Sequence, residues 1–165
     1  MNIRNFFRLL TIGMALTIAG CGGGGGGGAV PVVTPPATKA IVKLATTGTL
    51  PAGTTIGVVG ATVTYPTTKG LSITDTNVVP SGVAAGGTVV ANVTVPGEVI
   101  LGNLTATSAG FPIGEFATMT FSIAPGNSPV AGDFAIKPGS TTVADFANSL
   151  TITTASVVIQ SVTFQ

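Results

Sequence analysis

Apolar and polar residues alternate along several short stretches of this chain, which is the pattern of β-strands with one face in a core and the other in solvent. Between residues 88 and 95, valine or alanine occupies every second position and mainly threonine and asparagine lie between them. The same two-residue period runs through 40–44, 59–65 and 116–123. In residues 150–164 the phase of the alternation changes, which predicts a bulge or a break into two strands.

Segments rich in glycine and proline separate these stretches at intervals of roughly ten residues, as in antiparallel sandwiches and barrels. Examples are 51–53, 66–70, 96–97 and 125–127. No stretch of the chain has the length and the helix-forming residues that a helix needs, except for a single turn near 142–148. We therefore expect an all-β fold with antiparallel strands.

The N-terminus has the layout of a secretory signal. Two arginines lie within the first eight residues, and an uncharged run over 9–19 follows. Eleven residues are too few to cross a bilayer as a helix, which needs roughly 17 to 25. Residues 17–21 resemble the bacterial lipobox, in which a cysteine directs lipidation and the cut falls just before it. The resemblance implies cleavage between Gly20 and Cys21 and a diacylglyceryl group on Cys21. We expect anchoring in the cell envelope, at the outer membrane of a Gram-negative bacterium.

A tether follows the anchor. Seven consecutive glycines occupy 22–28, and three of the next eight residues are proline. Neither half can bury side chains in a core, and proline lacks a backbone donor. The chain is therefore predicted to divide into a cleaved signal peptide (1–20), a lipidated cysteine with a disordered Gly/Pro linker (21–37) and a β-domain (38–165).

Composition narrows the functional classes. Only 7% of the residues are charged, the formal net charge is +1, and histidine and tryptophan are absent. Removing 1–20 discards both arginines and leaves four lysines against five acids. No basic face is available for nucleic acid, and the acids form no recognisable metal loop. We expect no catalytic residues, no metal and no cofactor.

A family resemblance becomes visible in the order of these features. Four features in this order together resemble cohesin-like modules. They are the segment 60–66 ending in Tyr65-Pro66, then Gly70-Leu71, then a strand with a loop at 79–87, and finally the strand 114–121. Those modules, with their relatives among the cellulose-binding modules, are jelly-roll β-sandwiches of nine strands. The resemblance implies that fold and a docking role for a dockerin-like protein or a polysaccharide. The chain departs from the family because Pro66 directly follows Tyr65, where the family has an acidic residue.

Two aromatic residues are candidates for an exposed binding face, Tyr65 and Phe116. For Tyr65 the alternative is a tyrosine at the end of the sandwich whose hydroxyl bonds to backbone. Phe111, before a proline, is expected in an exposed loop. We therefore expect a membrane-anchored lipoprotein that displays a non-catalytic, cohesin-like binding module for a protein or polysaccharide. The alternative is a structural, self-associating component of an envelope assembly, favoured by the low charge of the predicted edges.

Overall fold

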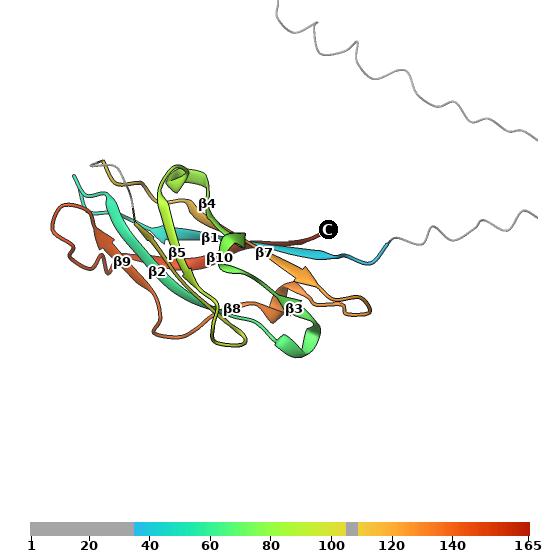
Figure 1. Cartoon of the computed structure of the whole chain (residues 1–165). Helices are drawn as coiled ribbons and strands as arrows, with labels where there is room; N and C mark the ends of the chain where they lie inside the picture. Colours follow the sequence, from blue (N-terminus) through green and yellow to red (C-terminus); the bar gives the residue numbers. More distant parts are fainter. Residues whose placement is uncertain (1–34, 105–108) are drawn as a thin grey trace, which may run out of the picture. The chain divides into compact units, whose positions relative to one another are not determined.

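Two antiparallel sheets face each other across one core in the computed structural model, which describes residues 35–104 and 109–165 (Figure 1). The expected signal peptide, the Cys21 lipidation site and all but the last residues of the tether lie outside the described residues. Residues 35–165 fall within a single folded unit. No helix among the described residues is long and apolar enough to span a membrane.

The first sheet has the strand order β10-β1-β7-β3, and β4 also pairs with β7. Its strands are β1 (Lys39–Gly48), β3 (Leu71–Ser72), β4 (Val78–Pro80), β7 (Glu115–Ile123) and β10 (Ala155–Phe164). Every pair in this sheet is antiparallel, and the longest ladders join β1 to its two neighbours.

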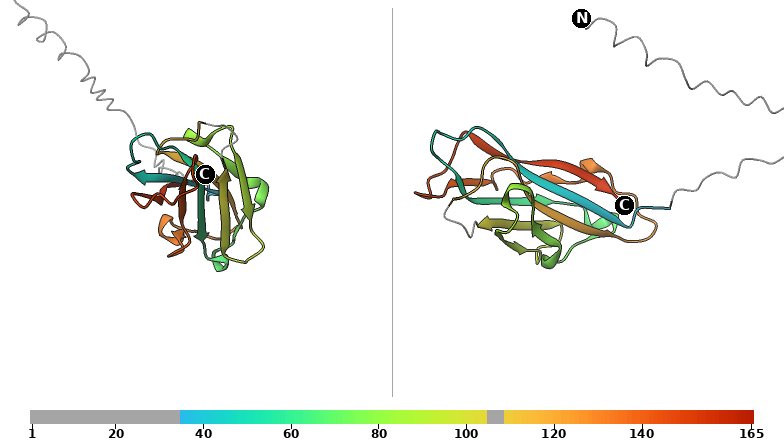
Figure 2. Two further views of the ribbon diagram at one scale, coloured as in Figure 1. Left: turned by 90° about the vertical axis from the view of Figure 1, so that its left-hand side faces the viewer. Right: turned by 90° about the horizontal axis from the view of Figure 1, so that it is seen from above.

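The second sheet has the order β5-β6-β2-β8, and β9 also pairs with β2. Its strands are β2 (Ile56–Thr64), β5 (Thr88–Asn92), β6 (Glu98–Leu104), β8 (Ala135–Ile136) and β9 (Thr142–Asp145). Short 3-10 turns in the connections are η2 (Thr67–Lys69), η3 (Asp75–Asn77), η4 (Gly82–Ala84) and η5 (Ala131–Asp133). Seen from the side, the two sheets form two layers (Figure 2).

The predicted alternation places the core between these layers. In β1 the residues Ala40, Val42 and Leu44 are fully buried. Lys39 and Lys43 alternate with them and lie on the outer face of the strand. Three aromatic rings meet near one end of the core, where Phe121 lies 5.0 Å from both Tyr65 and Phe134 between ring centroids. Apolar burial of this kind is the main stabilising contribution to such a fold.

Two bulges change the phase of strands in the first sheet. Against β1, the register of β10 skips Gln160 between Ile159 and Ser161. This confirms the phase change predicted for 150–164. Against β1 on its other side, β7 skips Phe116 between Glu115 and Ala117. A bulge turns the extra residue out of the regular alternation, so Phe116 and Ala117 are both fully buried although they are neighbours.

Three further predictions are wrong in detail. Residues 142–145 form strand β9 rather than a helical turn. The strand expected over 88–95 ends at Asn92, because the Asn92 side chain accepts hydrogen bonds from the backbone and hydroxyl of Thr94 and starts a turn. Phe111 is not exposed, because it pairs with Ile56 through two backbone hydrogen bonds that draw its ring into the core.

The ends of the described domain lie together. The backbone N–H groups of Thr38 and Lys39 both donate to the carbonyl of Gln165, at 2.6 and 2.8 Å. The entry to β1 and the exit from β10 therefore share one end of the sandwich, within the first sheet (Figure 1).

Candidate functional site

The outer surface of the second sheet carries few charges along its central strands. The strand registers place Val90, Gly102 and Gly60 in one row across β5, β6 and β2, and Asn92, Ile100 and Thr62 in the next. We call the surface formed by these six residues the sheet-two face. Val90 is 61% exposed and Ile100 is 41% exposed, whereas Thr62 is buried. The two β-branched apolar side chains are both neighbours of Gly102, Val90 across the strand pair and Ile100 along β6.

The glycine pair is not required by the fold. Neither Gly60 nor Gly102 has a positive φ. A Cβ atom built at Gly60 would lie 3.7 Å from the nearest atom, and one at Gly102 would lie 3.8 Å away. Both distances are ordinary van der Waals contacts. Because glycine weakens a strand interior, it often marks a place where another backbone or a ligand approaches closely.

Charge lies at the margin of this surface. The ammonium of Lys137 lies 2.7 Å from the carboxylate of Glu98, beyond the first two rows of the sheet-two face. Within the six residues themselves there is no ionisable group. Interface cores are depleted in charged residues, and the rim around them is polar. The sheet-two face and its margin follow that arrangement.

The outer surface of the first sheet is different. Lys43 lies 3.0 Å from Glu115, and Thr118 connects Glu115 to Ser81 through its hydroxyl. Hydrogen bonding from Ser81, with hydrogen bonding and charge attraction from Lys43, lowers the pKa of Glu115 despite its partial burial. This carboxylate is therefore occupied in holding β1, β4 and β7 together.

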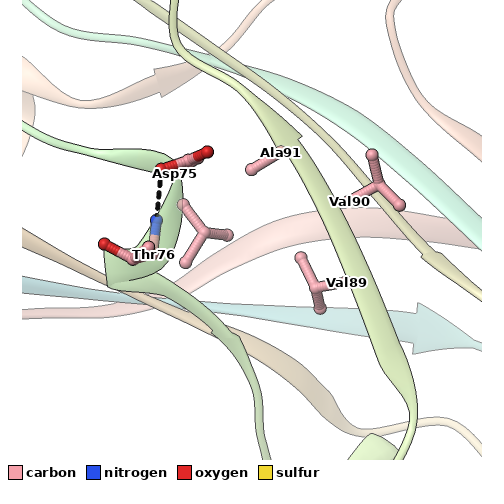
Figure 3. Close-up of a pocket in the computed structure, with 6 residues that line it drawn as sticks. Asp75, Thr76, Val89, Val90 and Ala91 are labelled. Carbon is pink, nitrogen blue, oxygen red and sulfur yellow. Dashed lines mark hydrogen bonds between the residues drawn. The ribbon is translucent and has the colours of Figure 1, made fainter.

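A groove runs along the outer edge of the second sheet, between β5 and η3. Its volume is about 360 Å³, and Asp75, Thr76, Val78, Val89, Val90 and Ala91 line it. Figure 3 shows Val89 and Ala91 directed toward Asp75 and Thr76, while Val90 points to the other side of β5. The groove and the sheet-two face therefore adjoin at β5 and share Val90.

The two aromatic residues predicted for a binding face behave differently. Phe116 is fully buried, so its ring cannot form part of an exposed surface, and the β7 bulge is the reason. Tyr65 is partly buried against the core, with its ring edge-on to Phe121. No hydrogen bond of its hydroxyl is present among the described residues. The two rings do not come together in one site.

The acidic residues have structural partners. Lys69 bonds both carboxylate oxygens of Asp133, which also accepts from the Val130 N–H, and these bonds lower the pKa of Asp133. Asp145 is 7% exposed and accepts from the backbone and side chain of Asn148 in a turn. No group of three metal-ligating side chains occurs in 35–104 and 109–165.

Sequence reasoning missed the sheet-two face because Gly60 and Gly102 meet only through strand pairing. The signal available in the sequence was the glycine at position 60 inside the predicted stretch 59–65, a position that weakens a strand.

Comparison with known proteins bears on the fold. The chain matches no protein-family model and shows no significant match to a curated protein. A cohesin–dockerin complex, the crystal structure of CaDoc0917 bound to CaCohA2 at pH 5.5, is similar to it with a TM-score of 0.55 and 17% sequence identity. The match covers 78% of this chain and 93% of that chain. The described domain is therefore an all-β, cohesin-like sandwich of two antiparallel sheets.

Proposed function

We propose that this protein is a lipid-anchored envelope protein whose cohesin-like sandwich docks a dockerin-like protein on the sheet-two face. The observation that carries the docking site is the Gly60–Gly102 pair, which lies beside the exposed side chains of Val90 and Ile100. The similar solved structure is itself a complex with a protein partner, which supports a protein-binding module.

A protein partner is favoured over a polysaccharide by the placement of the aromatic rings. Sugar-binding surfaces use exposed rings that stack on the faces of the sugar. On the sheet-two face the six defining residues include no aromatic side chain. Phe116 and Phe121 are fully buried, and Phe111 and Phe134 nearly so. Phe146 is 37% exposed, but it is a single ring that does not belong to the sheet-two face.

The docking proposal is tested with the mature chain solubilised in mild detergent and used to capture partners from the envelope and secreted fractions of its own bacterium. Ile100→Asp should reduce retention of a specific protein at least tenfold, because a charge would be desolvated at the centre of the interface. Val79→Asp is the matched control, since Val79 is 44% exposed on the outer surface of the other sheet. Equal retention by both variants would contradict the proposed face.

The anchor is tested separately. Mass spectrometry of the mature N-terminus should find acylated Cys21, and Cys21→Ser should move the protein from the membrane to the soluble fraction. More than one acyl chain is needed for stable anchoring, because a single myristoyl chain binds only marginally. An unmodified chain beginning at Met1 in the membrane would refute the signal, and separation of inner from outer membranes tests the destination.

A self-associating structural role is the second candidate. The edge strand β10 is ten residues long and contains no charged residue, glycine or proline. Uncharged edges of this kind pair readily with other strands. Sedimentation of the mature chain in detergent distinguishes the candidates, since a monomer across all accessible concentrations excludes homomeric assembly.

A further inference from the structure

The strand β5 has one unpaired edge. Among the described strands, β5 pairs only with β6, through all five of its residues from Thr88 to Asn92. In an antiparallel strand, alternate residues direct their N–H and C=O groups away from a given neighbour. On the outer edge of β5 no backbone hydrogen bond to another described residue occurs. These groups are placed to pair with an added strand.

The edge of β5 lacks the devices that normally prevent such pairing. Natural edge strands are commonly protected by charged side chains, proline or a bulge. The sequence of β5 is Thr-Val-Val-Ala-Asn, and its register against β6 is continuous. The edge is therefore chemically open, although it is short.

The groove beside this edge is shaped for the side chains of an added strand. Its apolar surface comes from buried Val78 and from Val89 and Ala91, which are partly buried against the core. A strand added to β5 would direct every second side chain toward η3 and β4, into the 360 Å³ of the groove. Those side chains should be apolar and β-branched, as on the facing strand.

One end of the groove carries an unpaired negative charge. Asp75 is exposed, and its carboxylate accepts one hydrogen bond, from the Thr76 N–H at 2.8 Å. Glu98, Glu115 and Asp133 each lie within 3.0 Å of a lysine, whereas Asp75 has no such partner in the part of the chain that the structure describes. A basic side chain from outside would complete the pattern.

We propose that the free edge of β5 receives an extended segment of a partner protein by strand addition, with apolar side chains in the groove and a lysine or arginine facing Asp75. This site shares Val90 with the sheet-two face but differs from it in using the free edge of β5, whereas Ile100 lies on β6 and does not line the groove. Main-chain hydrogen bonds would supply affinity, and the groove with Asp75 would supply selectivity.

The test uses the mature chain in mild detergent and a blocked, fluorescein-labelled peptide, Thr-Val-Thr-Val-Thr-Lys-Thr, in which the lysine lies on the same face of the strand as the valines. Binding is measured by fluorescence anisotropy. Amide hydrogen exchange is measured in parallel, and the amides of β5 should become protected when the peptide binds. A peptide N-methylated at alternate residues should bind at least tenfold more weakly, because it lacks main-chain donors. No binding of the parent peptide, or binding without protection of β5, would overturn the proposal.

A charge exchange tests the role of Asp75. Asp75→Lys should weaken the parent peptide at least tenfold and should bind the peptide with glutamate in place of lysine better than the unaltered protein does. Ile100→Asp should leave peptide binding unchanged, so failure of this site can be told from failure of the sheet-two face. Equal affinities of the two peptides for both proteins would overturn the assignment of Asp75. Protection of β5 that rises with protein concentration alone would identify a second copy as the occupant and would also overturn it.

Discussion

Replacing Gly102 by alanine should stabilise the domain. A Cβ atom at this position would have the Val59 carbonyl oxygen as its nearest neighbour, at 3.8 Å, so it would neither clash nor require backbone movement. Glycine in a strand interior costs roughly 0.5–1 kcal/mol relative to alanine, mainly because it loses more conformational freedom on folding. The facing residue, Gly60, has no side chain to obstruct the new methyl group.

The expected gain is therefore about 0.5–1 kcal/mol in the free energy of unfolding, or about 2–4 °C in melting temperature for a domain of this size. It is measured by urea unfolding of the mature chain, followed by circular dichroism at a fixed detergent concentration. The slope of the transition should not change, since the surface exposed on unfolding is nearly the same.

Gly57→Ala is the matched control on the neighbouring strand. Its φ is not positive either, but its Cβ would lie 2.5 Å from the Phe146 Cα, and this backbone atom cannot yield without a strand shift. This variant should lose about 1–3 kcal/mol through overpacking. If Gly102→Ala also destabilises the domain, the fold itself requires this glycine, and the argument that the pair serves a partner fails.

Three further outcomes are expected. Phe121→Ala should cost about 3–5 kcal/mol in urea unfolding, because a fully buried ring in contact with Tyr65 and Phe134 is removed; a loss below about 1 kcal/mol would contradict its place in the core. The folded-state pKa of Glu115 is below its usual 4.5, so the contribution of this carboxylate to the free energy of unfolding is present above pH 4.5 and is lost as the pH falls through the folded-state pKa. Glu115→Gln should flatten that part of the stability–pH curve. The change should be less than about 1 kcal/mol, because Lys43 is well exposed. Gly70→Ala should lower the melting temperature, because Gly70 has φ +67° and its Cβ would lie 2.5 Å from Asn127 Nδ2; an unchanged melting temperature would show that the turn relaxes freely.

The sequence predicted those features of the fold that depend on local alternation. Residues 40–44 and 117–123 alternate as expected, and the phase change near Gln160 is a bulge. In 59–63 the alternation is incomplete, because Thr62 on the predicted outer face is buried. The other predictions succeed because the burial of every second side chain is a property of a single strand. The all-β class and the two-layer arrangement follow from it together with the turn residues.

What failed depends on partners distant in the sequence. The bulge that buries Phe116 belongs to the register between β7 and β1, and the residues next to position 116 in the sequence do not signal this bulge. Phe111 is drawn inward by backbone pairing with Ile56. The glycine pair is similarly invisible until the register of β2 against β6 is known. Exposure of an aromatic residue in a connection therefore cannot be predicted from its neighbours in the chain.

The two sheets differ in the charge of their outer surfaces and in where the chain enters, and this difference supports docking on the second sheet. The chain enters the domain through β1, in the first sheet, and its first strand residue is bonded to Gln165 at the end of the sandwich. The whole core lies between that entry and the sheet-two face. The first sheet also carries Lys39 and the Lys43–Glu115 pair on its outer surface, and such charges disfavour apolar docking there. The charges therefore favour the second sheet over the first for the docking proposed here, so Ile100→Asp should reduce retention of the partner and Val79→Asp should leave it unchanged.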